Sequence, residues 1–356
     1  MAKNTAPLPI SLCMIIKNEE AFLNISLKSV ADLGIFDEIV VVDTGSTDNS
    51  VAIAKSYNAK VFEFEWVNDF AAARNFAAEK ATNDWILQMD ADEEIDYADA
   101  RELKNFIVNP RHIGTILMLE LLDRSHNHIV RLYNRQTHHH VGSIHEQIMP
   151  RDLKLKTLIL QTSLKYNHHG YLPEYGKIAG RLERNENLLF AALEKDPKNP
   201  YLLYQLGKSY FCDSRDLQKA CKYFGEALTQ NPDPALEYVY NLVECYGYAL
   251  INTNQAAAAL KLREKYLSYY SNIIPFRFLS GHIFQSNAMF VEAVECYESC
   301  LGADIIDYKG ITSYLSYYNI GVILECVGMA DDAVEMYKNC GDYDPASNRL
   351  AVLLSN

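Results

Sequence analysis

The sequence lacks long apolar runs, and its first residues lack the pattern of a signal peptide. None of its apolar stretches reaches the roughly 18 residues that a membrane-spanning helix requires. Residues 1–9 lack the basic, apolar and small-residue zones of a signal peptide. We therefore expect a cytoplasmic protein without a transmembrane segment.

Positive charge is also scarce. The 356 residues carry 33 lysines and arginines against 46 aspartates and glutamates, a formal net charge of −13. A chain with this balance has no electrostatic attraction for a phosphate backbone or an anionic membrane surface. Nucleic acid is therefore not expected among its partners.

Closely paired cysteines are missing as well. None of the eight cysteines belongs to a CxxC motif, and Cys296 and Cys300 are merely one helical turn apart. This spacing gives no support to a zinc site or a disulfide framework. We interpret the cysteines as buried thiols.

The first half of the chain alternates apolar runs with helical patterns, and 356 residues are enough for two domains. Continuous apolar runs at 10–16 and 38–42 predict strands covered on both faces, with a helix at 21–33 between them. The pattern continues with helix 50–57, strand 60–65, helix 69–82, strand 85–89 and helix 96–108. This order predicts an α/β fold with a doubly wound, parallel sheet.

The spacing changes after residue 110. Closely spaced β segments follow at 113–121, 128–135, 144–148 and 157–166. They predict a mixed or antiparallel extension of the same sheet.

The C-terminal half is helical and repetitive. One set of landmarks recurs at identical spacing in two copies, Gly281, Ala293, Tyr297 and Cys300, then Gly321, Ala333, Tyr337 and Cys340. Small residues let the two helices of a hairpin approach, and the aromatic residue fills the gap beside them. The pattern resembles tetratricopeptide (TPR) repeats. It predicts an all-α repeat domain at 173–356 that follows the α/β domain at 1–172.

A polar loop follows the second predicted strand. Asp43 opens the segment DTGSTDNS, which leads into a helix. A carboxylate at this end of a strand can accept hydrogen bonds from a nucleobase or ribose, while Gly45 permits a tight turn. Taken alone, the loop is equally well explained as a strand-to-helix turn with a good helix cap.

Three carboxylates follow the strand predicted at 85–89. Asp90, Asp92 and Glu94 occupy alternate positions, so an extended chain would point them the same way. A cluster without compensating charge repels itself, and a divalent cation with oxygen ligands would relieve the repulsion. Acidic residues also occur at helix starts without such a role. The metal prediction depends on the cluster having no lysine or arginine partner in the same chain.

Together, these segments resemble family 2 glycosyltransferases of the GT-A fold. The resemblance rests on SLCMIIKNEE, DEIVVVDTGSTDNS, DFAAARNFA and WILQMDADEE, in that order, and covers about residues 10–170. It implies an inverting transfer of a hexose from a nucleoside-diphosphate sugar, with a UDP-sugar favoured. Lys17 stands where many relatives have an aromatic residue that stacks on the base, so the identity of the base stays open.

The resemblance also implies roles for single residues. Glu19 and Asp43 would contact the nucleoside, Arg74 the donor's phosphates or sugar, and Asp90 the ribose or sugar hydroxyls. The nucleotide-sugar site would comprise Ile15, Lys17, Glu19, Asp43, Arg74, Asp90 and Ala91. A Mn²⁺ or Mg²⁺ ion would be held chiefly by Asp92, with His168 and Glu94.

Eight of the ten histidines lie between residues 126 and 169. In relatives that carry helical repeats, a His-Glu pair similar to His145 and Glu146 falls on the acceptor side, and His168 matches a late histidine near the metal. Glu146 is therefore our candidate for the base that deprotonates the acceptor. His145 remains the alternative for that role, or a further metal ligand. We interpret the triplet 138–140 as structural.

The function of the helical half stays open. An array of hairpins can hold a peptide, another subunit or a second copy of the chain in a homodimer. The resemblance extends to peptide S-glycosyltransferases of bacteriocin clusters and to surface-polysaccharide transferases, so the acceptor is expected to be a peptide, a protein or a glycan. One alternative is an inactive catalytic relic whose repeats bind other proteins. Another is nucleotidyl transfer, but SLCMIIKNEE lacks the glycine-rich and basic loop typical of that class.

Overall fold

The computed structural model describes residues 6–122, 125–170, 178–214, 216–302 and 310–355. The chain divides into two compact units, Met1–Leu188 and Leu189–Asn356. The predicted domain boundary between residues 172 and 173 lies outside the described residues. Helix α5 (Ile178–Lys195) runs from the first unit into the second.

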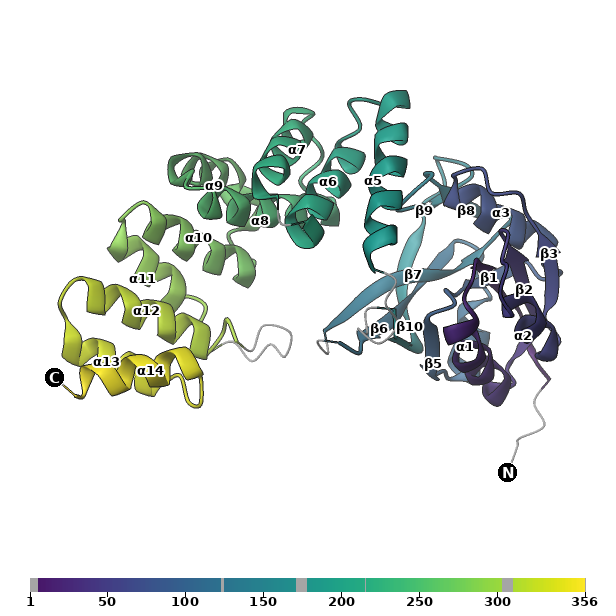
Figure 1. Cartoon of the computed structure of the whole chain (residues 1–356), viewed down its shortest axis with the longest axis horizontal. Helices are drawn as coiled ribbons and strands as arrows, with labels where there is room; N and C mark the ends of the chain where they lie inside the picture. Colours follow the sequence, from purple (N-terminus) through teal and green to yellow (C-terminus); the bar gives the residue numbers. More distant parts are fainter. Residues whose placement is uncertain (1–5, 123–124, 171–177, 215, 303–309, 356) are drawn as a thin grey trace. The chain divides into compact units, whose positions relative to one another are not determined.

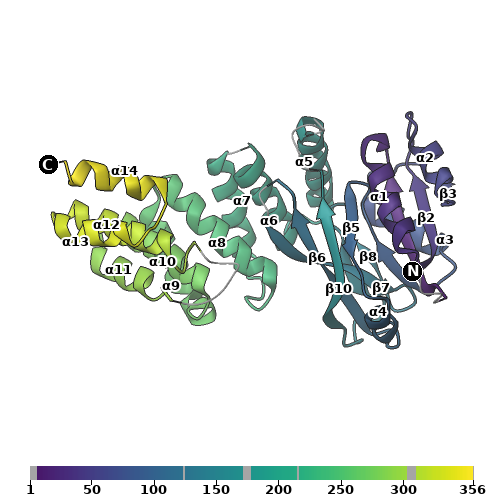
Figure 2. The same cartoon turned by 90° about the horizontal axis from the view of Figure 1, so that it is seen from below.

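The first unit is built on an eight-stranded sheet with the order β3-β2-β1-β4-β7-β6-β10-β5 (Figures 1 and 2). Strands β3, β2, β1 and β4 run parallel to one another, whereas β7 is antiparallel to both β4 and β6. This arrangement confirms the predicted mixed extension of a doubly wound sheet. The strands are β1 (Leu8–Ile16), β2 (Phe36–Asp43), β3 (Lys60–Glu63), β4 (Trp85–Gln88), β5 (Glu93–Tyr97), β6 (His112–Glu120), β7 (His126–Asn134) and β10 (Leu158–His168). A separate hairpin pairs β8 (His138–Val141) with β9 (Gln147–Pro150).

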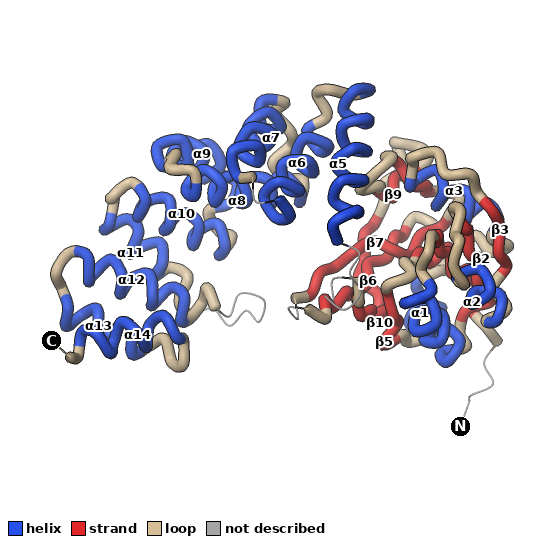
Figure 3. The backbone as a smooth tube through the Cα atoms, viewed as in Figure 1, coloured by secondary structure: helices blue, strands red, loops and turns tan. Residues whose placement is uncertain are grey.

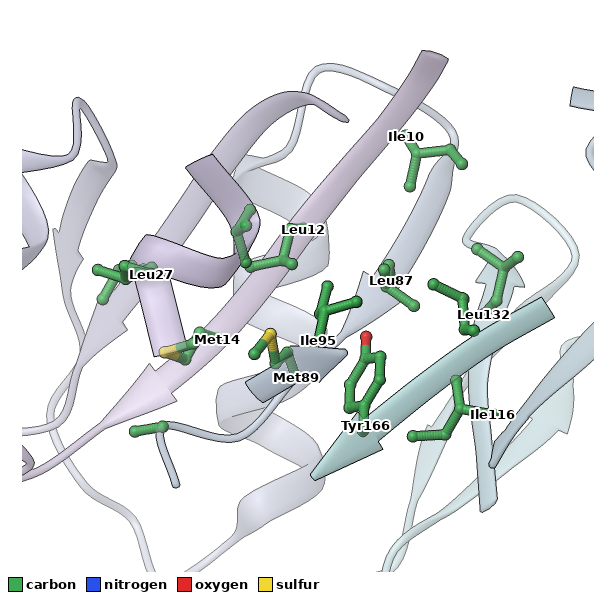
Figure 4. Packing of buried hydrophobic residues seen from close by; sticks show 14 of the residues in the cluster. Ile10, Leu12, Met14, Leu27, Leu87, Met89, Ile95, Ile116, Leu132 and Tyr166 are labelled. Atoms are coloured by element: carbon green, nitrogen blue, oxygen red, sulfur yellow. The ribbon is translucent and has the colours of Figure 1, made fainter. Parts of the chain in front are cut away.

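Helices cover both faces of this sheet. One core contains side chains of α1 (Glu20–Leu33), α2 (Ser50–Ser56) and α4 (Ala100–Phe106), and the other contains side chains of α3 (Phe70–Lys80). Figure 4 shows the first core, where Leu12 of β1, Leu87 of β4 and Tyr166 of β10 lie beside one another. Apolar residues on both faces of β1 explain its unbroken hydrophobic run.

Two predicted elements of this unit are wrong. The chain forms β5 and then the short helix α4 where a single helix was expected at 96–108, because residues 94–97 pair with the distant strand β10. The β segment expected at 144–148 begins only at Gln147, and β8 was not predicted. Gly142, with φ 103°, and His145, with φ 50°, make the turn between β8 and β9.

The second unit is a series of helical hairpins (Figure 3). The pairs are α6 (Pro200–Ser209) with α7 (Leu217–Thr229), α8 (Glu237–Asn252) with α9 (Ala256–Tyr270), α10 (Ile274–Ser286) with α11 (Phe290–Glu298), and α12 (Tyr314–Cys326) with α13 (Ala330–Lys338). A π-helical turn, η2 (Tyr210–Ser214), follows α6, and α14 (Asp344–Leu353) closes the series.

The predicted contact between small and aromatic residues holds these hairpins together. A Cβ atom added to Gly281 would lie 2.6 Å from the Tyr297 ring, and one added to Gly321 would lie 2.7 Å from the Tyr337 ring. Only glycine therefore permits this approach. In the α8–α9 hairpin, Gly247 packs against Leu279 of the next hairpin instead. The unit is an array of TPR-like hairpins, as predicted.

Two further expectations concern membranes and thiols. In the described part of the chain, no helix combines the length and apolar character needed to cross a bilayer. All eight cysteines are free thiols, and five are buried. The expectation of buried thiols is wrong for Cys212 and Cys326, which are exposed, and Cys296 is half-buried.

Candidate active site

A cavity of about 590 Å³ opens in the first unit, beyond the carboxyl ends of β1, β2 and β4. Parallel strands place their ligands at this edge because the loops that follow them converge there. The cavity is lined by Ile15, Ile16, Lys17, Asn18, Glu19, Phe22, Thr44, Trp66, Phe70, Arg74, Asp90, Ala91, Asp92, Gly170 and Arg184.

Most of the expected nucleotide-sugar residues line this cavity. Six of the seven do so, namely Ile15, Lys17, Glu19, Arg74, Asp90 and Ala91. Asp43 does not, because its carboxylate accepts hydrogen bonds from the backbone N–H of Ser46 at 3.0 and 3.2 Å. In this conformation Asp43 shapes the loop after β2, and Thr44 is the residue of that loop that lines the cavity.

The two motif loops beside the cavity are tied together by their own side chains. The Asn18 side-chain oxygen accepts a hydrogen bond from the Thr47 N–H at 2.7 Å, and the Glu20 carboxylate accepts one from the Asn49 N–H at 3.0 Å. Asn18 has a left-handed φ of 56°, which asparagine tolerates better than most residues. The polar residues after β1 and β2 therefore fix the shape of this wall.

Asp90 has two cationic partners from its own chain. Its carboxylate oxygens lie 2.9 Å from Arg74 Nη1 and 2.8 Å from Arg131 Nη2. Arg74 also pairs with Glu146, and Arg131 also pairs with Glu93. We call this alternating series Glu146–Arg74–Asp90–Arg131–Glu93 the charge row. The expectation of three uncompensated carboxylates is wrong, and the argument for a metal that rested on it no longer holds.

The charge row changes the acidity of its buried members. Burial favours the neutral form of Asp90, but Arg131 and Arg74 outweigh it and hold the pKa of its carboxyl well below the usual range. Burial raises the pKa of Glu93 to about 7, although Arg131 opposes the shift. Asp90 is therefore ionised at neutral pH and presents a fixed negative charge to the cavity.

Asp92 has a different partner. Its Oδ2 lies 3.4 Å from His168 Nε2, and the other ring nitrogen of His168 is 2.7 Å from a Glu120 oxygen. Burial lowers the pKa of His168, but the hydrogen bonds to Asp92 and Glu120 outweigh it and raise the pKa to about 10. A cation bound between Asp92 and His168 would replace the ring proton.

The surroundings of this pair fit a small divalent cation. A Cβ atom at Gly170 would lie 2.2 Å from Asp92 Oδ2 and 2.8 Å from His168 Nε2, so only a glycine can lie this close to the pair. An oxygen and a nitrogen ligand suit Mn²⁺, and Mg²⁺ commonly uses one or two carboxylates plus phosphate and water. Within the described ranges, no group of three or more candidate ligands assembles. A cation here would draw its remaining ligands from a bound diphosphate and water.

The other expected residues are spread around the site. Glu94 contacts His169 Nε2 at 3.0 Å and does not line the cavity. The strand expected to carry it ends at Gln88, so Asp90 and Asp92 lie in a turn and the predicted alternation is wrong. Neither His145 nor Glu146 lines the cavity. His145 is exposed, whereas the side chain of Glu146 is only 12% exposed and contacts Arg74, which does line it. His138 is buried between two threonine hydroxyls at 2.9 Å, which confirms its structural interpretation.

Sequence reasoning missed several residues of the site. Arg131 lies 41 residues from Asp90 in the chain, and no motif connects them. Trp66 and Phe70 form an aromatic wall with ring centroids 4.9 Å apart, and the Arg184 guanidinium lies 5.3 Å from the Phe70 ring. Phe70 is the second residue of the DFAAARNFA segment and Trp66 lies three residues before that segment, so these two aromatic residues were the available signal.

Comparisons with known proteins agree with this geometry. A family model described as glycosyl transferase family 2 matches residues 11–171. A TPR repeat-containing protein of Synechococcus elongatus is 32% identical over 240 residues, which cover 64% of this chain and 59% of the relative. The prophage-derived glycosyltransferase SunS of Bacillus subtilis is 29% identical over 230 residues, which cover 62% of this chain and 53% of SunS. The matches thus span somewhat more than half of these relatives.

A solved structure resembles the helical part. The TPR protein YrrB, whose structure is described as having an unusual peptide-binding site, is 21% identical, with a TM-score of 0.41. The match covers 50% of this chain and 85% of YrrB. Residues 11–171 match the model of glycosyl transferase family 2, so this part of the chain is similar to the domains of that family.

Proposed function

We propose that the chain is an inverting, metal-dependent hexosyltransferase that uses a nucleoside-diphosphate sugar, with a UDP-sugar favoured. The observation that carries the proposal is the cavity itself. The buried Arg74 and Asp92 both line it, at the edge of a parallel sheet where nucleotides bind, and Asp92 in turn contacts His168. The family match of the same residues supports it.

The donor's parts match different walls of the cavity. The loop at 15–19 and Thr44 would hold the nucleoside, and Asp90 would accept hydrogen bonds from ribose or sugar hydroxyls. Arg74 would contact the diphosphate, because a guanidinium group suits phosphate oxygens. Asp92 and His168 would hold Mn²⁺ or Mg²⁺, which when bound neutralises charge on the diphosphate.

The transfer needs one proton acceptor on the far side of the sugar. The acceptor's nucleophile forms a bond to the anomeric carbon while the bond from that carbon to the diphosphate breaks, and the nucleophile's proton passes to the base. Glu146 is our candidate, because its carboxylate contacts Arg74 beside the cavity, whereas His145 is exposed. Arg74 stabilises the negative charge that the departing diphosphate gains.

The TPR-like hairpins would recruit the acceptor, a peptide, protein or glycan, or pair two copies of the chain. The relatives supply one feature each, since SunS is named as a glycosyltransferase and the Synechococcus protein as containing TPR repeats. An extended array of hairpins offers a surface suited to a peptide.

One observation favours a second candidate function. Two arginines already neutralise Asp90, as expected of a catalytic relic in a protein that works through its repeats. The cavity that Asp92 and Gly170 line argues against a relic, because it leaves a volume in which a donor could bind.

The test is a donor panel followed by product analysis. The full chain with Mn²⁺ is titrated with UDP-, GDP- and dTDP-sugars, and transfer to candidate peptides is followed by mass spectrometry. We expect one donor class to bind and a hexose mass to appear on an acceptor. Failure of all three donor classes to bind would favour the relic.

A further inference from the structure

Arg74 is shared unequally between two carboxylates. It contacts Glu146 through Nε and Asp90 through Nη1 at 2.9 Å, and its side chain is only 8% exposed. Asp90 has a second cationic partner, Arg131. Among the residues that the structure describes, Glu146 pairs with Arg74 alone. Without Arg74, Glu146 would therefore lose its cationic partner, whereas Asp90 would keep Arg131.

A donor diphosphate would need the same guanidinium group. Arg74 lines the cavity, and it is the one arginine of the charge row that does so. A diphosphate at this wall would place at least two negative charges beside Glu146, where burial strengthens the repulsion between like charges. The diphosphate and Glu146 cannot both keep full use of Arg74.

We infer that the donor diphosphate competes with Glu146 for Arg74, so that donor binding releases the catalytic base. This inference rests on the proposed function and adds an order of events to it. Without donor, the ion pair with Arg74 occupies the Glu146 carboxylate. Once the diphosphate engages Arg74, Glu146 becomes available to the acceptor. The base is thereby activated only when a sugar is present to transfer.

The opposite role for Glu146 makes the opposite prediction. If Glu146 merely positioned Arg74 for the diphosphate, removing its charge would weaken donor binding. If the two compete, removing that charge strengthens it. The sign of the change in affinity therefore separates the two roles.

The experiment measures UDP and uridine binding by calorimetry, with Mn²⁺ and the full chain. Glu146→Gln keeps the size of the side chain and removes its charge. We expect UDP to bind about tenfold more tightly, a change of about 1.4 kcal/mol, while uridine affinity is unchanged because it has no phosphate. Transfer should be lost. Glu146→Ala is measured in parallel, so that the result does not depend on how glutamine contacts Arg74.

The matched control is Glu79→Gln. Glu79 is an exposed residue of the same helix as Arg74, and its substitution makes the same change in net charge. We expect its UDP affinity to equal that of the wild type. Unchanged or weaker UDP binding by both Glu146 variants would overturn the inference while leaving the proposed function standing. A wild-type chain that binds neither UDP nor GDP nor dTDP would instead remove the proposed function, and the inference with it.

Discussion

Arg131→Met is the substitution whose effect follows most directly from the charge row. It removes the group that neutralises Glu93, which is 2% exposed, and half of the neutralisation of Asp90. The two carboxylates are already close, because both contact Nη2 of Arg131. Methionine fills much of the space but leaves these acids to repel each other.

The magnitude follows from burial. Removing one partner of a buried ion pair typically costs about 3–5 kcal/mol, because the remaining charge stays out of water. We expect the lower end, about 3 kcal/mol, since Glu93 can take up a proton with its pKa already near 7. Arg131→Lys, which keeps the charge but loses the forked geometry, should lose about half as much.

Urea unfolding of the first unit, followed by the fluorescence of Trp66 and Trp85, measures this loss. Arg101→Met is the control, because it removes an exposed arginine of the same unit. UDP affinity should also fall in Arg131→Met, since Asp90 loses its fixed orientation. A stability within about 0.5 kcal/mol of the wild type would refute the reasoning, because that is the range of ordinary surface substitutions.

Two further predictions concern the Asp92–His168 pair and the stability of the protein in acid. Gly170→Ala should weaken Mn²⁺-dependent UDP binding at least about tenfold, because the added carbon would lie 2.2 Å from Asp92 Oδ2; calorimetry showing wild-type affinity would contradict this. Burial raises the pKa of Glu38, but hydrogen bonds from Lys60, Ser11 and Thr82 outweigh it and lower the pKa from 4.5 to about 2. The stabilisation from Glu38 is therefore full above pH 4.5 and lost as pH falls through 2, so the urea midpoints of wild type and Glu38→Gln should converge across that window. A constant difference from pH 6 to pH 2 would exclude this assignment.

The sequence predicted the elements whose signals are local. The apolar run at 10–16 and the helical spacing at 21–33 correspond to β1 and α1 within a few residues. The repeat spacing predicted the contact of Gly281 with Tyr297, because that spacing is a property of one hairpin. Long-range pairing limited the rest. Residues 94–97 carry no strand signal of their own and become β5 only because β10 is beside them.

The same limit applies to the site. Residues that follow β1 and β4 were found because parallel strands bring their ends together. The partners of the carboxylates were not found, since Arg131 comes from β7 and its contact with Asp90 depends on the folded sheet. Asp90, Asp92 and Glu94 were expected to act together, yet each faces a different partner: the two arginines, His168 and His169. Alternate side chains point the same way only while the backbone stays extended, and here the backbone turns after β4.

The central claim is that Asp92 holds a divalent cation that binds the donor's diphosphate. Calorimetry of UDP binding to the wild type and to Asp92→Ala, each with Mn²⁺ and with a chelator, tests it directly. The wild type should bind UDP only with Mn²⁺, and Asp92→Ala should remain folded but bind UDP no better with Mn²⁺ than without it. Equal Mn²⁺-dependent binding by both proteins would contradict the claim.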